Sequence, residues 1–467
     1  MNPIETEHHP MSSYDLDTTT LRARLTGALV LPGDADWDGA RQAWQLTVDQ
    51  RPEAVVLAEN ADDVVAAVDA ARAAGLRVAA QATGHNANPL GSLSGTVLVK
   101  TSRMRGVAVD PEKRTVRVEA GALWGDVTAA AAPYGLMGLA GSAADVGVVG
   151  YTLGGGLSWL ARKHGLAANG VVAAEAVTAD GVLRRIDAST EPDLFWAVRG
   201  GGGSFAVVTA LELDLVPVGD LHGGTLFWPV ERAAEVLHAW REWTATLPDE
   251  VTSIGRLLRF PPLEEIPEPV RGQSFVAVEL VSLLDQDRTD AVLAPLRELA
   301  PVMDTVHPCT PHDLAQIHMD PPQPVPAAGD GVLLGALPAE ALDAYLALTG
   351  PDTDFSLLST EIRHLGGALA PQPGTGGAVS GLDAAYAVFT VTITPDEAAV
   401  KATHQVLDAV AQALRPWSTG TSYLNFAERS GGAPFAEPAV LARLGRVKAQ
   451  YDPADVVRGN HPVAPAA

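Results

Sequence analysis

Glycine is concentrated in three short segments of this chain, each set among apolar residues. They are the turn at Gly84, the run from Gly141 to Gly156, and the block Gly200–Gly203. Each glycine loses more backbone entropy on folding than alanine does, so such clusters persist where the main chain must approach another group closely. One cluster is typical of a tight turn in a β-rich domain. Three clusters predict that bare backbone packs against something flat or bulky.

The first cluster follows a predicted strand–helix–strand unit. Ala54–Leu57 is apolar and extended, Ala61–Ala74 has the character of a helix that Gly75 stops, and Arg77–Gln81 is a second strand. The chain then enters a tight turn in which small residues let backbone N–H groups approach an anion. His85 is held at the rim of this turn. A Gly-His turn is a weak signal alone, and it gains weight from the glycine clusters downstream.

Length, charge and cysteine content restrict the class of protein. The chain has 467 residues, enough for two or three domains. Its 32 Lys and Arg against 56 Asp and Glu give a formal net charge of −24, so nucleic acid and anionic membranes are not expected partners. Cys309 is the only cysteine, which excludes an intrachain disulfide. Residues 1–20 are polar and contain no apolar stretch typical of a signal peptide, so we expect a mobile segment there and a cytoplasmic protein.

Between about residues 220 and 415 the pattern changes to strands interspersed with helices, which indicates an α+β domain. The predicted strands are Thr225–Val230, Ser253–Arg259, Phe275–Val281, Phe355–His364 and Ala385–Ile393. The predicted helices are Glu231–Leu247, Arg288–Leu299, Pro338–Leu348 and Asp396–Leu414. Three breaks rich in proline or glycine are candidate active-site lids: Pro261–Pro269, Asp320–Pro326 and Pro371–Gly381.

The glycine clusters belong to an ordered set of motifs that spans the chain. The set comprises Gly84-His85, Ser102–Met104, Gly121–Asp126, Val146–Gly156, Asp193–Trp196, Gly200–Gly203, Val207–Thr209, Tyr423–Phe426, Val447–Pro453 and Asn460. In this order the motifs resemble the vanillyl-alcohol-oxidase superfamily, whose members carry a PCMH-type FAD-binding domain, and specifically its berberine-bridge-enzyme-like branch. Each motif alone is unspecific, whereas the whole ordered set is highly specific.

The resemblance implies a two-lobed α+β fold. A PCMH-type FAD-binding domain would be followed by an α+β substrate domain whose antiparallel sheet roofs the flavin. We therefore expect a mobile N-terminus (1–20), an FAD-binding domain (21–218), a substrate-binding domain (219–415) and a C-terminal segment (416–467) that returns to the FAD-binding domain.

The resemblance also implies FAD that is attached covalently through one histidine. In the family, the residue matching His85 forms a bond to the 8α-methyl group of the flavin, and this electron-poor substituent raises the affinity of the flavin for electrons. Many relatives add a cysteinyl link, but Ala143 stands at that position and Cys309 lies in the wrong region. The residues expected to bind the cofactor are Ala82, Thr83, Gly84, His85, Asn86, Gly141, Ser142, Val146, Gly147, Gly150, Gly154, Gly155, Val207 and Asn425.

The catalytic candidates come from two places in the chain. The resemblance points to Tyr423, in a Tyr-x-Asn motif, as the base that takes a proton while hydride leaves the substrate. Glu361 is the competing candidate, since it lies two residues from Arg363 on a predicted strand and shares a face with it. Tyr151 could line the pocket, and Arg363 and His364 are expected at the substrate.

A second constellation contains residue types that bind metals: His307, Cys309, His312, His318 and Asp320. Its spacing fits no recognised zinc pattern, and Pro308 and Pro311 break any helix that would align the ligands. The favoured interpretation is a proline-rich loop with polar residues, and no metal is expected. The chain also lacks a P-loop and a Gly-x-Ser-x-Gly motif, so phosphoryl transfer and serine hydrolysis have no support.

The sequence therefore predicts an FAD-dependent oxidoreductase, an oxidase that passes electrons to O2. Its small-molecule substrate would be an alcohol or a hydroxylated ring, as in natural-product tailoring or sugar oxidation. The first alternative is a dehydrogenase with an acceptor other than O2. An alternative of another class is a flavin-holding protein without turnover, which is disfavoured because Tyr423 and Glu361 are intact.

Overall fold

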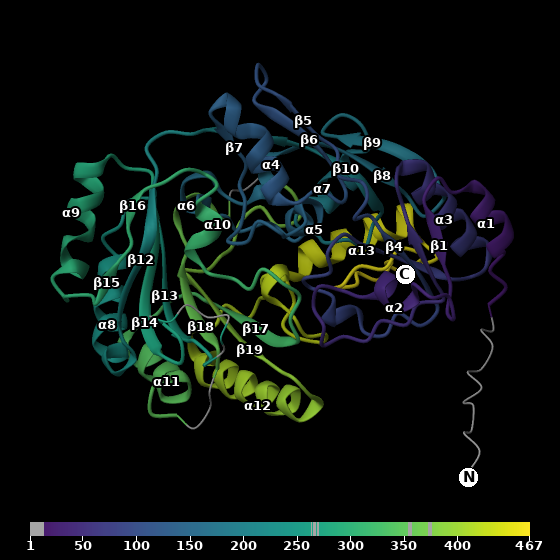
Figure 1. Ribbon diagram of the computed structural model, residues 1–467. Helices are drawn as coiled ribbons and strands as arrows, with labels where there is room; N and C mark the ends of the chain where they lie inside the picture. Colours follow the sequence, from purple (N-terminus) through teal and green to yellow (C-terminus); the bar gives the residue numbers. More distant parts are fainter. Residues whose placement is uncertain (1–13, 263, 265–267, 269, 354–356, 372–375) are drawn as a thin grey trace, which may run out of the picture.

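The chain folds into two lobes that lie side by side (Figure 1). The computed structural model describes residues 14–262, 264, 268, 270–353, 357–371 and 376–467. The first lobe contains two sheets of moderate size, and the second contains one large antiparallel sheet. Helices and mainly antiparallel strands are mixed throughout, which confirms the predicted α+β class.

The first sheet of the first lobe has the order β1-β2-β4-β3. Its strands are β1 (Ala28–Val30), β2 (Ala54–Leu57), β3 (Arg77–Gln81) and β4 (Thr96–Lys100). Helix α3 (Ala61–Ala73) connects β2 to β3, and both of these strands run parallel to β4. The side chain of Asn60 accepts a hydrogen bond from the backbone N–H of Asp63 at 3.0 Å and so caps α3. The predicted strand–helix–strand unit is confirmed.

The second sheet of this lobe is antiparallel and has the order β5-β6-β10-β8-β9. Its strands are β5 (Val107–Asp110), β6 (Thr115–Glu119), β8 (Val171–Val177), β9 (Leu183–Asp187) and β10 (Val207–Asp214). The neighbouring short elements are α4 (Trp124–Ala131), β7 (Leu136–Met137), α5 (Val148–Leu153), α6 (Ala161–His164), α7 (Pro192–Val198) and β11 (Val216–Pro217). Two of the predicted glycine clusters lie around α5 and after α7.

The C-terminal part of the chain returns to the first lobe. Helix α13 (Pro438–Tyr451) is followed by a segment that pairs with β3: the backbone N–H of Val78 donates to the Val456 carbonyl at 2.7 Å. Lys448 is fully buried, and its Nζ donates to the carbonyls of Ser204 (2.8 Å) and Val457 (2.7 Å). A buried ammonium group is stable only with such partners, so Lys448 fastens the C-terminal segment to the first lobe.

The second lobe is built on a sheet with the order β15-β12-β14-β13-β18-β19-β17, and β16 also pairs with β12. The strands are β12 (His222–Pro229), β13 (Val251–Arg259), β14 (Ser274–Ser282), β15 (Met303–Asp304), β16 (His307–Pro308), β17 (Ala327–Leu334), β18 (Ser359–His364) and β19 (Tyr386–Ile393). Each of the five predicted strands overlaps one of these, whereas β17 was not predicted. Its sequence includes Gly329, Asp330 and Gly331, which lower the apparent strand propensity.

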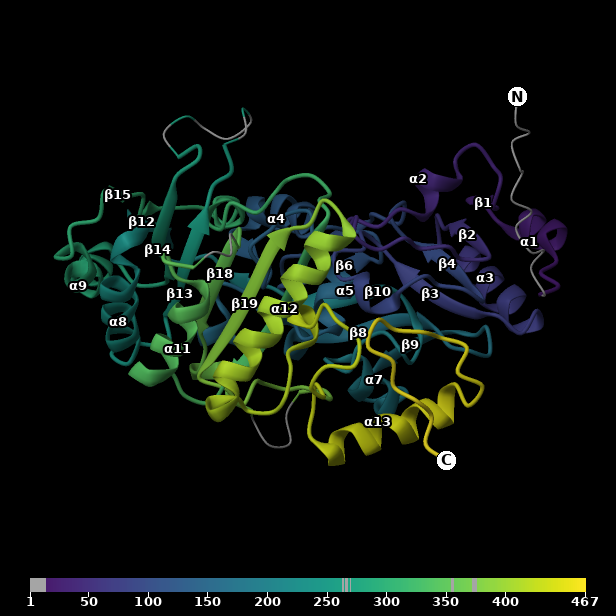
Figure 2. The same cartoon turned by 90° about the horizontal axis from the view of Figure 1, so that it is seen from below.

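One face of this sheet is covered by helices α8 (Ala233–Thr244), α9 (Gln286–Arg297), α11 (Ala339–Thr349) and α12 (Glu397–Leu414) (Figures 1 and 2). Trp240 of α8 and Tyr345 of α11 are buried there with Ile362 of β18. Because neighbouring side chains of a strand point to opposite faces, Glu361 and Arg363 face the other side, toward the first lobe. This face, which the helices leave uncovered, is the one that the sequence predicted to roof the flavin.

Three further points concern the predicted segments. Within the segment predicted to be mobile (1–20), residues 1–13 lie outside the described part, but α1 (Thr18–Arg24) already begins at Thr18, with Asp17 as its cap. The strand predicted from residue 355 begins at Ser359, and residues 355 and 356 lie outside the described part. Candidate lids 261–269 and 371–381 also fall partly outside the described residues.

No helix in the described ranges is long and apolar enough to cross a membrane.

Candidate active site

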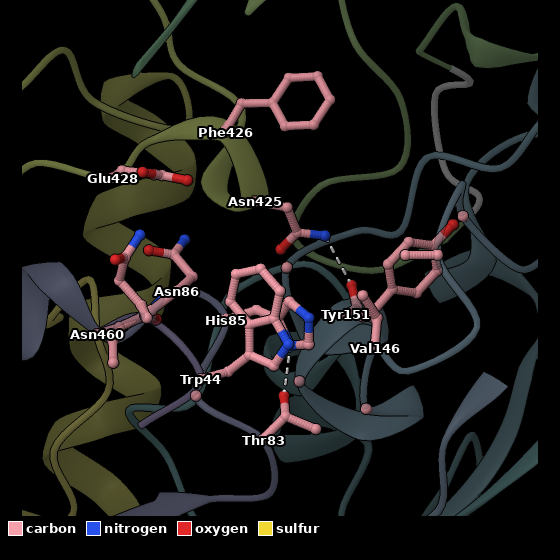
Figure 3. A pocket seen from close by; sticks show the side chains of 18 of the residues that line it. Trp44, Thr83, His85, Asn86, Val146, Tyr151, Asn425, Phe426, Glu428 and Asn460 are labelled. Carbon is pink, nitrogen blue, oxygen red and sulfur yellow. Dashed lines mark hydrogen bonds between the residues drawn. The ribbon is translucent and has the colours of Figure 1, made fainter. Parts of the chain in front are cut away.

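A cavity of about 420 Å³ lies between the two lobes. The turn after β3, the segment around α5 and the C-terminal segment form its walls on the first-lobe side, and β18 and β19 contribute to the opposite side. Figure 3 shows the side chains that point into it, among them His85, Tyr151, Asn425 and Glu428. Segments that are far apart in the sequence therefore converge on a single space.

His85 is fixed on several sides. Its Nδ1 lies 2.8 Å from the hydroxyl of Thr83, and its ring stacks on the ring of Trp44 with 4.2 Å between centroids (Figure 3). Its Nε2 is buried, has no hydrogen-bond partner, and lies 3.5 Å from Oδ2 of Asp145. The imidazole is thus held rigidly at the cavity, with one nitrogen unsatisfied.

The turn that carries His85 requires glycine. Gly84 has φ +88°, and a Cβ there would lie 2.6 Å from the side chain of Gln81. The backbone N–H of Trp44 donates to the Thr83 carbonyl at 2.9 Å, which brings the indole beside the imidazole. Sequence analysis missed Trp44, because it lies about forty residues earlier in a segment with no regular pattern.

Asp145 links the indole and the imidazole. Trp44 Nε1 donates to Asp145 Oδ2 at 2.9 Å, and the same oxygen is the one nearest to His85. Burial raises the pKa of Asp145, but its interactions with His85 and Trp44 outweigh burial and hold the pKa below its usual value. The predicted loop from Val146 onward thus has an ionised carboxylate directly before it, which the sequence pattern did not single out.

Six glycines of the second and third predicted clusters line the cavity, and we call them the glycine wall: Gly141, Gly147, Gly150, Gly154, Gly202 and Gly203. A Cβ at Gly150 would meet no atom within 4 Å, and at Gly203 the nearest atom would be 3.9 Å away. Nearby polar atoms, including Asn86 Oδ1 and Glu428 Oε2, are buried without hydrogen-bond partners. Open backbone together with unpaired polar atoms fits a large cofactor with a flat ring and many polar groups, such as FAD.

Most residues predicted to bind the cofactor line this cavity: Ala82, Thr83, Gly84, His85, Asn86, Gly141, Ser142, Val146, Gly147, Gly150, Gly154 and Asn425. Two do not. A Cβ at Gly155 would lie 3.2 Å from the ring of Tyr423, so this glycine packs behind the tyrosine. Val207 is buried in the hydrophobic core, and its neighbour Val208 lines the cavity instead, because successive residues of a strand face opposite sides.

Tyr423 places its hydroxyl inside the cavity. Asn425 Nδ2 donates to this hydroxyl at 3.0 Å and to the backbone carbonyl of Tyr151 at 3.0 Å. Burial raises the pKa of Tyr423, while the N–H groups of Asn425, Leu157 and Gly156 and the charge of Arg363 lower it, and the net shift is upward. Tyr151 also lines the cavity, but its hydroxyl donates to the Leu139 carbonyl at 3.0 Å.

Opposite Tyr423 lie five buried or nearly buried charged residues, four on the sheet and one directly after α10 (Leu314–Ile317), which we call the charged cluster: Arg256, Glu279, His318, Glu361 and Arg363. Arg256 on β13 donates to Glu279 on β14 at 2.7 Å. On β18, Arg363 Nε donates to Glu361 Oε1 at 2.6 Å. The predicted pairing of Glu361 and Arg363 on one strand face is therefore present in the structure.

His318 joins the two acidic residues of the cluster. Its Nδ1 lies 2.5 Å from Glu279 Oε2 and its Nε2 lies 2.9 Å from Glu361 Oε2. Burial and the charge of Arg256 lower the pKa of His318, but Glu279 and Glu361 outweigh both and raise it to about 9. Burial raises the pKa of Glu361, yet Arg363 and His318 hold it far below its usual range.

Sequence analysis did not predict this cluster. Arg256 lies opposite Glu361 across the β13–β18 pair, and Glu279 sits in the middle of the apolar strand β14. Burying a charged residue inside an apolar strand costs free energy unless the charge is paired. The sequence therefore did indicate that these two residues have buried partners. His318 was considered only as a metal ligand.

The candidate metal ligands do not converge. His307 is exposed and its Nδ1 contacts the Thr305 carbonyl at 2.7 Å, Cys309 is half-buried, and His318 is turned to the charged cluster. Across the described ranges, no group of three or more His, Cys, Asp or Glu residues is placed to hold a metal ion. Of this set, His318 and Asp320 line the cavity.

His364 lies apart from the main cavity. Its Nε2 is 3.1 Å from a guanidinium nitrogen of Arg162, and its ring is 5.6 Å from that of Tyr386. Burial and the charge of Arg162 lower its pKa to about 3. Of the two residues predicted at the substrate, Arg363 lines the main cavity and His364 does not, although both border a smaller pocket beside β18.

Glu428 is a second buried acid of the cavity, and sequence analysis did not name it. Burial and the nearby charge of Asp330 raise its pKa to about 7, with a backbone hydrogen bond to Gly329 opposing them. Figure 3 shows Glu428 on the same side as Asn86 and Asn460. It therefore differs from Glu361, whose negative charge is balanced by cations.

Part of the chain matches a known cofactor-binding domain. The sequence pattern of the FAD binding domain matches residues 52–187. An FAD-linked oxidoreductase of Bacillus subtilis, YgaK, is 32% identical over 237 residues, which are 50% of this chain and 52% of that protein. The (R)-6-hydroxynicotine oxidase of Paenarthrobacter nicotinovorans is 32% identical over 191 residues, 41% of this chain and 42% of that one. These alignments span about half the length of each relative or less.

Other relatives match over nearly the whole length. A second FAD-linked oxidoreductase of Bacillus subtilis, YvdP, is 26% identical over 469 residues, covering 95% of this chain and 99% of that protein. The structure of a berberine-bridge-enzyme-like protein from Physcomitrella patens superposes with a TM-score of 0.83 at 18% identity, covering 96% and 99% of the two chains. That of 6-hydroxy-D-nicotine oxidase from Arthrobacter nicotinovorans gives 0.80 at 23% identity, covering 95% and 98%. The chain thus carries an FAD-binding domain at residues 52–187 and has the fold of these two structures.

Proposed function

We propose that this protein is an FAD-dependent oxidase that removes hydride from a small alcohol or hydroxylated ring and passes the electrons to O2. One observation carries the proposal. A single cavity holds the glycine wall, His85 and Tyr423 on one side, and the ion pair of Glu361 and Arg363 on the other. Cofactor-binding and proton-transferring groups therefore face the same space.

We further propose that FAD is attached covalently, and only through His85. The imidazole is held by Thr83 and Trp44, and its Nε2 is buried without a hydrogen-bond partner at the cavity. Ala143 lines the same cavity at the position where relatives carry a cysteine. Cys309 packs against Gly223 in the sheet of the second lobe, and the residues that line the cavity do not include it.

Bound FAD would supply the hydride acceptor and the site that reacts with O2. The protein must then hold the substrate and accept its proton, and two residues are candidates for the second task. Glu361 is poorly suited, because Oε1 accepts from Arg363 and Oε2 lies 2.9 Å from His318. A carboxylate held by two cations has little tendency to take up a proton.

Tyr423 is the better candidate for the base. The groups that face its oxygen, namely Asn425 Nδ2 and the backbone N–H groups of Leu157 and Gly156, all stabilise the phenolate form. The charge of Arg363 acts in the same direction. We assign Arg363, which also contacts the face of Phe426 at 4.9 Å, to holding the substrate.

The proposal is tested by anaerobic mixing of the purified protein with a panel of alcohols, phenols and sugars. Bleaching of the flavin absorbance by one class, followed by recovery when air is admitted, is the expected result. Bleaching without recovery in air identifies a dehydrogenase with another acceptor. No bleaching with any compound, while the flavin can still be reduced by dithionite, contradicts the proposed oxidation and favours a flavin-holding protein.

A further inference from the structure

His318 lies at the centre of the charged cluster. The proposed chemistry gives this imidazole no role. It follows α10 (Leu314–Ile317), and its side chain is 5% exposed. The ring lies between two carboxylates from different strands, Glu279 on β14 and Glu361 on β18. Trp159 closes one side, with its ring 6.3 Å from the imidazole.

The distances decide the protonation state of this ring. A neutral imidazole has only one N–H, whereas here Nδ1 is 2.5 Å from Glu279 and Nε2 is 2.9 Å from Glu361. The guanidinium groups of Arg256 and Arg363 also approach the two nitrogens, but from 3.3 and 3.5 Å. Nδ1 hydrogen-bonds to Glu279 Oε2, whereas Glu361 Oε2 is buried without a hydrogen bond and lies only at ion-pair distance from Nε2. An unprotonated Nε2 would turn its lone pair toward this carboxylate, so the geometry favours an imidazolium.

The charges of the surrounding residues also favour a protonated His318. His318 is faced by Glu279 on β14, Arg256 on β13, Glu361 and Arg363 on β18, and Asp320 on its own loop. With His318 protonated, three cations balance three carboxylates. Without its charge the group carries one excess negative charge in a buried site, which is costly.

The cluster is connected to the proposed base. Arg363 Nε donates to Glu361 Oε1 at 2.6 Å, and the guanidinium lies over the Phe426 ring. The ring of Tyr423 packs against the edge of the same phenylalanine, with 5.0 Å between centroids. Arg363 is thus held between Glu361 and Phe426, and its positive charge favours ionisation of the Tyr423 hydroxyl.

We propose that His318 is the positioning residue of this site: as an imidazolium it fixes Glu361 in its ionised form, and through Glu361 it holds Arg363 where its charge acts on Tyr423. The assignment of the base rests on the proposed function. The bridging of two carboxylates by an imidazolium does not, and the two parts can be tested separately.

The first experiment tests the bridge without any substrate. ¹⁵N-histidine is incorporated into the flavin-loaded protein, and the signal of His318 is assigned by its absence in His318→Gln. Both ring nitrogens of His318 are expected to remain protonated at pH 8, because the pKa lies near 9, and to lose a proton only above that. A neutral ring with one unprotonated nitrogen at pH 7 overturns the proposal.

The second experiment measures how the rate of flavin reduction depends on pH in His318→Gln, with a substrate found in the panel. Loss of the imidazolium is expected to slow reduction by about 10-fold to 100-fold at neutral pH. The deficit should shrink above about pH 9, since His318 of the wild type then loses its own charge, and substrate affinity should change little. A deficit that is the same at every pH indicates a purely structural role and contradicts the proposal.

Two further variants keep the test decisive. His222 is a matched control, because it is also buried but contacts only neutral oxygens, those of Leu284 and Gln286, each at 3.1 Å. His222→Gln should leave the pH profile unchanged. His318→Lys restores a positive charge and should return the profile toward that of the wild type, and it serves if His318→Gln does not fold. If the lysine variant does not restore the profile, the proposed role of the charge is overturned.

If no compound reduces the flavin, the proposed function fails, whereas the NMR result still decides whether His318 is an imidazolium between the two carboxylates.

Discussion

The two sides of the cavity are built on opposite principles. The glycine wall consists of main chain without side chains, and its space is available because no Cβ fills it. The charged cluster consists of side chains from three strands of one sheet and of His318 from the loop after α10, each held by an oppositely charged partner. We therefore expect the first side to select a ligand by shape and by backbone polarity, and the second side by charge.

The difference is clearest for two buried acids of the same cavity. Glu361 is surrounded by Arg363 and His318, so its pKa falls although burial alone would raise it. Glu428 has no such cations, and burial with Asp330 raises its pKa to about 7. A buried carboxyl group therefore keeps its charge only where the sheet supplies counter-charges, and it favours the neutral form elsewhere.

The largest effect is expected from Tyr423→Phe, which removes only the hydroxyl that faces the charged cluster. The rate of flavin reduction should fall by about 10²- to 10⁴-fold, the usual scale for loss of a general base, while substrate affinity changes little. Rapid mixing under anaerobic conditions measures both. Tyr345→Phe is the control, because this phenol is buried in the helix-covered core and does not line the cavity.

Glu361→Gln tests the competing assignment in the same assay. If Tyr423→Phe reduces its flavin at nearly the normal rate while Glu361→Gln does not, the carboxylate is the base, and the two cations around it do not prevent proton uptake. Loss of activity in both variants indicates a coupled pair. Loss in neither shifts attention to Tyr151, whose hydroxyl is buried at the same cavity.

The same contrast explains how far the sequence could predict the site. The glycine wall was predicted, because each glycine cluster is continuous in the sequence and glycine has few other reasons to accumulate. The unit from Ala54 to Gln81 and the strands and helices of the second lobe were predicted from their hydrophobic periodicity. Among the long strands of this sheet, the edge strand β17, which contains two glycines and an aspartate, did not show this pattern.

The charged cluster could not be predicted in the same way. Arg256 and Glu279 are brought together by the register of β13 and β14, and His318 reaches them from the loop after α10. Trp44 likewise reaches His85 through backbone pairing with the turn at Thr83. Such contacts depend on tertiary structure, and local sequence carries at most a charge in an unexpected apolar strand as a sign of them.

The glycine wall is tested by filling it. Gly150→Leu places a side chain where the cavity is open, and binding of FAD should weaken by about 10- to 100-fold because overpacking costs about 1–3 kcal/mol. The amount of FAD per chain after purification measures this. Gly39→Leu is a matched control, since Gly39 is also a helical glycine with no atom within 4 Å of a Cβ, and it does not line the cavity. Equal FAD content in both variants would contradict the assignment of the wall.

His85→Ala separates the covalent bond from the rest of the cofactor side. The wild type should keep its flavin on the polypeptide after acid denaturation, and mass spectrometry should find one attachment, at His85. The variant should still bind FAD through the glycine wall but release it in acid. Its flavin should be reduced more slowly, by roughly tenfold, because loss of the bond lowers the driving force for hydride transfer. A second attachment site in the wild type would contradict the role assigned to Ala143.

The smallest effect is expected from Glu428→Gln, which keeps the shape of the side chain and removes its titration. The pKa of Glu428 is raised in the folded state from 4.5 to about 7, so its contribution to stability is fully present below pH 4.5 and is lost as pH rises through 7. The loss corresponds to about 3 kcal/mol, or about 3 °C in Tm for a chain of this length. The Tm of the variant minus that of the wild type should therefore increase between pH 5 and pH 8.

Glu437→Gln, at the exposed start of α13, is the control for this difference. A constant difference between Glu428→Gln and the wild type across this range would mean that Glu428 keeps its charge without a cationic partner, and the contrast between the two sides of the cavity would then fail.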